Sequence, residues 1–294
     1  MRYFAVVIYL VFALSSCHGG DEISDAYGNF ESTEIIISAQ ANGEILKFGI
    51  EEGDLLDANQ IVGLIDTTDL YLRKKLLAQQ IKTIGSSLAS INSEIDVKKQ
   101  QLENSLVNQK RITRLYEQAA ATKKQLDDIN GLVDLNRKMI VSVNSKKRSV
   151  LDQMEGVKIQ IEQIDENISK CLIKNPSPGT VMVKYAERGE LTAIGKPLYK
   201  IADVRKIKLK AYISGNQLPN IKLGDEVEVL YDKDMTANST VMGKVIWISN
   251  TAEFTPKTIQ TKEERVNLVY AVKVLVPNDG SIKIGMPGEM NFVK

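Results

Sequence analysis

The sequence predicts an α+β protein in which a long antiparallel helical hairpin is inserted into a split β-sandwich and is followed by a small β-barrel. Two observations carry this prediction: two adjoining stretches have a coiled-coil repeat, and two similar glycine-marked β segments flank them. All seven prolines lie at or after Pro176, so the preceding residues can support long helices, and the remainder favours turn-rich β structure.

The helical prediction rests on apolar residues that recur in alternating steps of three and four. A period of 3.5 residues is the signature of a left-handed coiled coil. Two such arms predict an antiparallel hairpin over residues 67–170, with its tip near 116–124 and a reach of roughly 70 Å. The repeating positions are Leu77, Ile81, Ile84, Leu88, Ile91, Ile95, Leu102 and Ile112, then Leu126, Ile129, Val133, Ile140, Val143, Val150, Met154, Val157, Ile161, Ile164 and Ile168.

Five polar residues occupy positions in the seam of this repeat: Lys98, Ser105, Gln109, Asn136 and Lys147. Polar groups buried in a coiled-coil seam lower its stability but fix its register. Two other interpretations stay open at this point. These positions could meet neighbouring copies or water, or they could simply be tolerated in a partly exposed seam.

The two β segments share one pattern, which is a turn glycine, a strand, a second turn glycine and another strand. Gly43 corresponds to Gly179 and Gly53 to Gly189, and both pairs lie 136 positions apart. Glycine suits tight turns that require a positive φ. One segment is too small to bury a core alone, so the two are predicted to close one sandwich. Two unrelated hairpins are the alternative.

The β regions lie on both sides of the hairpin. The two halves of the sandwich are predicted at 34–66 and 171–203, and residues 34–38 are also a candidate strand of the barrel. Several short strands at regular spacing predict that barrel over residues 204–294. Its predicted strands are 207–213, 226–231, 241–249, 268–276 and 288–293.

The amino terminus predicts export and lipidation. An apolar run over residues 3–14 is too short to span a membrane and fits a signal peptide over residues 1–16. The sequence Leu-Ser-Ser-Cys ending at Cys17 resembles a bacterial lipobox. This resemblance implies cleavage before Cys17, acylation of that residue and a lipid-anchored tether over residues 17–33. An ordinary signal peptide with a chance cysteine is the alternative.

The composition argues against most enzymes and several classes of binding protein. A formal net charge of +1 gives no reason to expect a nucleic acid as partner. The chain has one histidine, His18, and two cysteines, Cys17 and Cys171, which is too few for a zinc site or a disulfide scaffold. We therefore expect no enzyme activity, no catalytic residue, no metal and no cofactor. Cys171 is expected to be a small buried apolar residue.

Split biotinyl-lipoyl-like halves around a coiled-coil hairpin resemble the periplasmic adaptor proteins of bacterial efflux and secretion systems, which are membrane fusion proteins of the haemolysin-D type. In lipoyl and biotin carriers a lysine between the halves holds the cofactor, whereas the hairpin occupies that place here. Residues 269–273 and 285–288 further resemble the adaptors that work with ABC-type exporters.

The resemblance implies a periplasmic lipoprotein anchored to the inner membrane. Such an adaptor links an inner-membrane transporter, of ABC type, to a TolC-like outer-membrane channel for the export of small molecules or peptides. It also implies a homo-oligomer, a hexameric ring. A lipid-anchored coiled-coil scaffold without a channel partner is the alternative. The matched halves argue against it, because a plain scaffold has no need to close its hairpin in this way.

The resemblance also assigns residues at the hairpin tip. In the family an Arg, a Leu four residues later and a Ser eleven residues after the Arg dock the outer-membrane channel. Arg111, Leu115 and Thr122 stand at these spacings, with Thr in place of Ser. Their local alternatives are a surface charge, a packing contact and a helix cap. Thr122 followed by Gln125 predicts a capping box at the start of the second arm.

Overall fold

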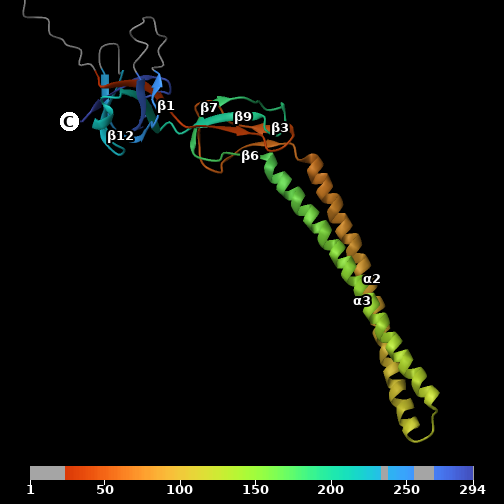
Figure 1. Ribbon diagram of the computed structural model, residues 1–294. Coiled ribbons are helices and arrows are strands. Elements are labelled where there is room, and N and C mark those ends of the chain that lie inside the picture. The colour runs from red at the N-terminus through yellow and green to blue at the C-terminus, as the bar shows by residue number, and fades with distance from the viewer. Residues whose placement is uncertain (1–23, 233–237, 255–267, 294) are drawn as a thin grey trace, which may run out of the picture.

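The computed structural model of the protein describes residues 24–232, 238–254 and 268–293, which form three parts in a row (Figure 1). A β-barrel lies at one end, a β-sandwich follows it, and a two-helix hairpin extends from the sandwich to the opposite end. The predicted architecture, a hairpin inserted into a split sandwich and followed by a barrel, is confirmed. The predicted signal peptide and Cys17 lie outside the described residues.

The β-sandwich contains eight short strands, which are β2 (Glu34–Ser38), β3 (Gly43–Phe48), β4 (Leu55–Leu56), β5 (Ile61–Ile65), β6 (Leu172–Lys174), β7 (Gly179–Lys184), β8 (Leu191–Thr192) and β9 (Pro197–Ala202). They form two sheets with the orders β2-β9-β7-β4 and β6-β5-β3-β8. The two orders become identical when each strand is replaced by its counterpart in the other half. The halves are therefore related by a pseudo-twofold axis, and each sheet combines strands from both.

Matching backbone hydrogen bonds join the two halves. The N–H of Gly53 donates to the carbonyl of Val181 at 2.9 Å, and the N–H of Gly189 donates to the carbonyl of Ile45 at 2.8 Å. Gly53 and Gly189 have φ values of 97° and 90°, a region that L side chains rarely adopt. The predicted positive-φ turns are confirmed at both positions, and they bring each half onto a strand of the other.

The other two repeat glycines serve different purposes. Gly43 has a positive φ of 150°, as predicted. Gly179 does not, so the prediction of a positive-φ turn is wrong there. A Cβ at Gly179 would lie 3.1 Å from the carbonyl oxygen of Ala202 on the neighbouring strand. Glycine at this position allows the close approach of β7 and β9 instead.

Two strand placements correct the sequence prediction. Residues 26–31, which were predicted to belong to the tether over 17–33, form strand β1 (Ala26–Glu31) of the barrel and bury Phe30 completely. Gly28 obscures this strand in the sequence because glycine is a poor strand former. It is required here, because a Cβ at Gly28 would lie 2.0 Å from the carbonyl oxygen of Lys210.

The candidate barrel strand at residues 34–38 belongs to the sandwich instead. It is β2, which pairs with β9 in antiparallel register. Ile37 points into the sandwich core, and Glu34 forms an ion pair with Lys200 of β9 at 2.9 Å. The burial of Ile37 among both halves favours this placement over one in the barrel.

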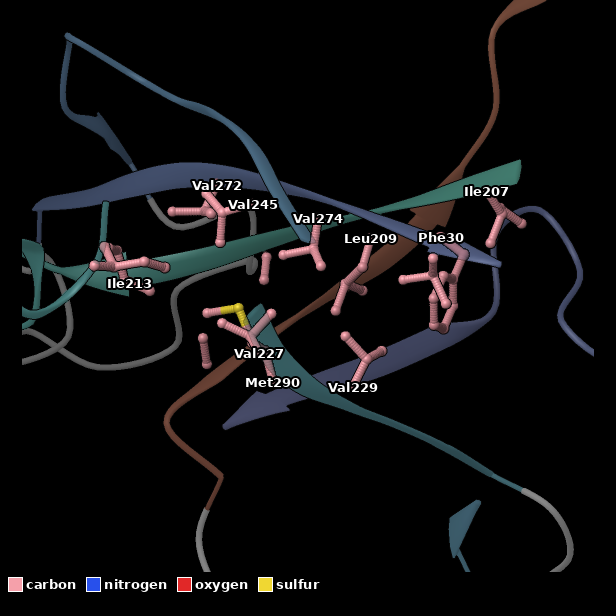
Figure 2. Close-up of a cluster of buried hydrophobic side chains, with 14 of the residues drawn as sticks. Phe30, Ile207, Leu209, Ile213, Val227, Val229, Val245, Val272, Val274 and Met290 are labelled. Carbon is pink, nitrogen blue, oxygen red and sulfur yellow. The ribbon is translucent and has the colours of Figure 1, made fainter. Parts of the chain in front are cut away.

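The barrel contains β1 together with β10 (Lys206–Ser214), β11 (Glu226–Asp232), β12 (Asn238–Ile248), β13 (Glu253–Phe254), β14 (Leu268–Pro277) and β15 (Pro287–Phe292). The order is β10-β1-β15-β11-β12-β14-β13, and pairing of β10 with β14 closes six of these strands into a barrel. A short 3₁₀ helix, η1 (Leu218–Asn220), follows β10. Figure 2 shows Phe30, Leu209, Val229 and Met290 directed into one shared core.

The hairpin consists of α2 (Thr68–Glu117) and α3 (Lys123–Cys171), of 50 and 49 residues. At 1.5 Å per residue each helix is about 75 Å long. The predicted seam positions are all buried or half-buried, and Ile91, Ile95 and Val143 form one buried cluster within the seam. Within the described residues, no helix is long and apolar enough to cross a bilayer.

The hairpin and the sandwich are joined at adjacent strands, because α2 follows β5, α3 leads into β6, and β5 pairs with β6. Asn175, directly after β6, is completely buried and fixes this base. Its side-chain amide donates to the carbonyls of Asp57, at 2.9 Å, and Ser177, at 2.6 Å. Its side-chain oxygen accepts from the hydroxyl of Tyr199 at 3.2 Å. The burial of Tyr199 raises the pKa of its phenol to about 12.

This pKa predicts that the sandwich loses stability in strong base. Tyr199 is protonated in both states below pH 10, but between pH 10 and pH 12 only the unfolded chain releases the proton. The free energy of unfolding should therefore fall by about 1–3 kcal/mol over this interval. Urea denaturation across the interval should show a shallower fall for Tyr199→Phe than for the wild type. Equal slopes would contradict the prediction.

Candidate functional site: the hairpin tip

The tip of the hairpin is a short connection over residues 118–122. The N–H of Ala120 donates to the carbonyl of Leu115 at 2.7 Å, and the N–H of Ala119 donates to that of Tyr116 at 2.9 Å. This pair of bonds is the Schellman motif, which ends many helices. Ala119 occupies the left-handed position of the motif with a φ of 58°. The connection lies within the predicted tip at 116–124, but the Ala-Ala-Ala run there favours helix, so the left-handed residue was not predicted.

The second helix begins with the predicted capping box. The N–H of Gln125 donates to the hydroxyl oxygen of Thr122 at 3.3 Å, and the side-chain oxygen of Gln125 accepts from the Thr122 N–H at 2.7 Å. Both bonds satisfy N–H groups that have no partner inside the helix. The turn is therefore closed on both sides, by a Schellman motif before it and a capping box after it.

The three predicted docking residues lie around this turn. Arg111 is exposed, and one Nη donates to the side-chain oxygen of Asn108 at 2.7 Å. Leu115 lies one turn further along the same face of α2 and is half-buried. Thr122 is exposed on the other side of the turn, where its hydroxyl caps α3. The arrangement presents a cation with free donor positions, an apolar side chain and a capped turn at the end of a long rod.

A polar layer in the seam sets how the two arms align below the tip. The side-chain amide of Asn136 donates to the hydroxyl of Ser105 at 2.8 Å, and both residues are buried. Closer to the tip, the amide of Gln109 donates to the side-chain oxygen of Asn130 at 2.7 Å. A shift of register would leave the buried pair without partners, so these positions favour the register interpretation.

Ion pairs between the arms contribute less to this alignment. Lys74 and Asp165 lie 2.6 Å apart near the base, and Glu94 and Lys146 lie 3.7 Å apart further out. All four side chains are largely exposed, and exposed pairs contribute about 0–1 kcal/mol each. The apolar seam and the buried pair of Ser105 and Asn136 therefore determine how the two helices align up to the tip.

The base of the hairpin holds two further polar arrangements. The carboxylate of Asp66 accepts from the hydroxyl of Thr68 at 2.6 Å and from its N–H at 2.9 Å, and the hydroxyl bond lowers the pKa of Asp66. Cys171 is completely buried, as predicted, and burial raises the pKa of its thiol. Among the residues that the structure describes, no group of His, Cys, Asp and Glu side chains could hold a metal ion.

The left-handed conformation of Ala119 predicts that the tip can be stabilised. Ala119→Gly should raise the free energy of unfolding by about 0.5–1 kcal/mol, because glycine adopts this conformation without a Cβ clash. Ala120→Gly is the matched control, since Ala120 does not have a positive φ, and it should leave stability unchanged or lower it. Urea denaturation followed by circular dichroism measures both. Equal effects of the two substitutions would contradict the prediction.

Comparison of sequences finds relatives that match nearly the whole chain. No family model matches the chain. It is 22% identical to a UPF0194 membrane protein of Yersinia enterocolitica over 91% of the chain and 89% of that protein. It is 23% identical to a UPF0194 membrane protein of Acidithiobacillus ferridurans over 97% of the chain and 94% of that protein.

Two solved structures share the arrangement of domains. MacA from Actinobacillus actinomycetemcomitans aligns with a TM-score of 0.58 at 20% identity, over 91% of this chain and 78% of MacA. A membrane fusion protein from Streptococcus pneumoniae aligns with a TM-score of 0.59 at 13% identity, over 90% of this chain and 99% of that protein. The resemblance to membrane fusion proteins that the sequence carries is confirmed at the level of the fold.

Proposed function

We propose that this chain, which has the fold of the membrane fusion proteins, is a periplasmic adaptor. It would link an inner-membrane transporter to an outer-membrane channel. The observation that carries the proposal is a rod about 75 Å long that leaves a closed sandwich at one point and ends in a structured turn. Such a rod can bridge two partners, and the fold shared with MacA supports this role.

The tip is proposed to dock a TolC-like outer-membrane channel. An apolar side chain flanked by a cation can enter a groove between the helices of a partner. Leu115 supplies the apolar group, and Arg111 has five N–H donors, of which one is paired with Asn108. Thr122 would act by holding the turn, since its hydroxyl is engaged with Gln125.

The other end of the molecule is proposed to meet the inner membrane. Acylation of Cys17 would anchor the chain there, and the barrel would contact a transporter of the ABC type. The transporter would supply the energy from ATP, and the adaptor would contribute assembly and sealing during export of small molecules or peptides. The lipobox sequence and the resemblance of residues 269–273 and 285–288 support these assignments.

A ring of copies, six in the family that the sequence resembles, is proposed to surround the export path. A ring needs two different contact surfaces on each copy, because its interfaces are head-to-tail. Ile36 on β2 and Leu55 on β4 lie at the two opposite edges of one sheet and are 55% and 74% exposed. Their separation across the sheet is suited to contacts with a copy on each side.

The ring contact can be tested on these two edges. Ile36→Lys or Leu55→Lys should shift the protein toward the monomer, because a lysine would have to be desolvated in an apolar contact. Leu191→Lys is the matched control, since Leu191 is the pseudo-twofold counterpart of Leu55 on the other sheet and is 76% exposed. Native mass spectrometry of the detergent-extracted protein measures the copy number. An unchanged distribution in the edge variants would argue against this interface.

The proposed contact between the hairpin tip and the outer-membrane channel provides a second test. Arg111→Asp and Leu115→Ser should reduce recovery of the outer-membrane channel after mild cross-linking by about ten-fold or more. Recovery of the inner-membrane transporter and the protein level should stay unchanged. Lys110→Asp is the control, because Lys110 is also an exposed cation of α2 but lies about 100° around the helix from Arg111, off the face that Arg111 and Leu115 share.

Two outcomes of this experiment would count against the proposal. Full channel recovery with Arg111→Asp and Leu115→Ser would overturn the tip assignment. Recovery of neither a transporter nor a channel with the wild-type protein would favour the alternative, a lipid-anchored coiled-coil scaffold without a channel partner.

A further inference from the structure

The two ends of the barrel differ in chemistry. One end is formed by the starts of β1, β11 and β14 and the ends of β10, β12 and β15, and we call it the free end. The chain enters β10 from the sandwich and leaves β1 toward the sandwich through the opposite end, so the free end faces away from the hairpin (Figure 1). It is the pole of the molecule farthest from the tip.

Apolar and aromatic side chains gather at the rim of the free end. Five large ones are between 40% and 70% exposed, and they come from five different elements or connections. Leu223 precedes β11 and shares its loop with Ile221, which lines a surface hollow together with Val293. These five rim residues are Tyr27, Leu223, Trp247, Leu268 and Val293.

The opposite end of the barrel exposes a different set of side chains. Among the described residues, most of those exposed at the strand ends and connections there are polar or charged, and they include Arg205, Lys206, Asp232, Asn238, Asp279 and Lys283. Met242, Pro277 and Pro287 are exposed apolar residues at this end. The free end therefore exposes more large apolar side chains than the opposite end of the same barrel does.

The amino-terminal segment joins the molecule at this rim. The carbonyl of Asp25 accepts from the amide of Gln217 at 2.7 Å, and its carboxylate accepts from the N–H of Phe292 at 2.9 Å. The N–H of Asp25 donates to the side chain of Asn291 at 3.1 Å. Six residues separate Cys17 from Ser24, and they span at most roughly 25 Å.

We infer that the free end of the barrel rests on the surface of the lipid bilayer, with the rim residues at the level of the headgroups. The inference rests on the proposed acylation of Cys17, since that anchor and its short tether bring the rim to the membrane. An end-on contact with a flat surface explains why the rim residues come from all around the barrel. Tyr and Trp favour such an interface, where one end of the side chain is apolar and the other is wet.

The position of Trp247 agrees with this orientation. A β-bulge between Val245 and Trp247 turns Ile246 and Trp247 outward together. The ammonium group of Lys273 lies 5.6 Å from the centre of the Trp247 ring. The same ammonium group is ion-paired with Glu31 at 2.6 Å, so it is Trp247, an exposed aromatic side chain with one N–H donor, that suits the headgroup level.

The cysteine content of the chain allows a direct test. Cys17 would be acylated and Cys171 is completely buried, so one introduced cysteine can be labelled selectively in the full-length, membrane-anchored protein. Leu223→Cys carries an environment-sensitive fluorophore at the rim. Lys283→Cys carries it at the opposite end of the barrel and is the control. Each protein is reconstituted into phospholipid vesicles that contain no other protein.

The inference predicts a blue-shifted emission at Leu223→Cys and about two-fold quenching when brominated lipids replace ordinary ones, because an interfacial side chain lies within about 5–10 Å of the acyl chains. Lys283→Cys should show neither effect. Trp247 is the only tryptophan, so its own emission should be quenched by the same lipids in the unsubstituted protein. This measurement stands even if the labelled variant folds poorly.

Three results would overturn the inference. An aqueous spectrum at Leu223→Cys with unquenched Trp247, in a protein shown to be acylated, would reject the bilayer contact and leave the anchor standing. A blue shift that requires an added transporter would assign the rim to a protein partner. Absence of incorporated fatty acid at Cys17, checked by metabolic labelling against Cys17→Ser, would reject the anchor and the contact that depends on it.

Discussion

The whole molecule depends on how two separated chain segments close one sandwich. The backbone bonds from Gly53 to Val181 and from Gly189 to Ile45 are the same interaction made twice, once in each direction. Neither segment has enough strands to bury a core, so each provides the missing edge of the other. This closure holds the two ends of a hundred-residue insertion at adjacent strands. The base of the hairpin is thereby fixed by the sandwich core, to which the helices add only Cys171 and Leu70 at their ends.

The parts of this fold that follow simple periodic rules could be predicted from the sequence. The heptad seam, the repeat of Gly43 and Gly53, and the capping box at Thr122 each follow from a local pattern with a physical cause. The parts that were not predicted depend on tertiary contacts. Gly28 makes β1 look unlike a strand, although the approach of Lys210 requires it. Ala119 takes a conformation that its own propensity opposes, because both helices must turn there.

The candidate sites divide in the same way. The positions of Arg111 and Leu115 on one face of α2 follow from helical spacing alone. The hydrogen bonds of the Asn175 side chain could not be predicted from spacing, since its partners Asp57 and Tyr199 come from both halves of the sandwich. The apolar rim of the barrel was also hidden, because Leu223, Leu268 and Val293 lie far apart in the sequence and meet only when six strands close.

Both helices of the hairpin are joined to the paired strands β5 and β6, so the length of the hairpin can change without a change in the sandwich. Insertion of one heptad into each arm, opposite one another, would lengthen the rod by about 10 Å and preserve the seam. The sandwich, the turn at Ala119 and the barrel would keep their local structure. The distance between the barrel and the tip can therefore change by the addition or removal of matched heptads, while the structures at the two ends stay unchanged.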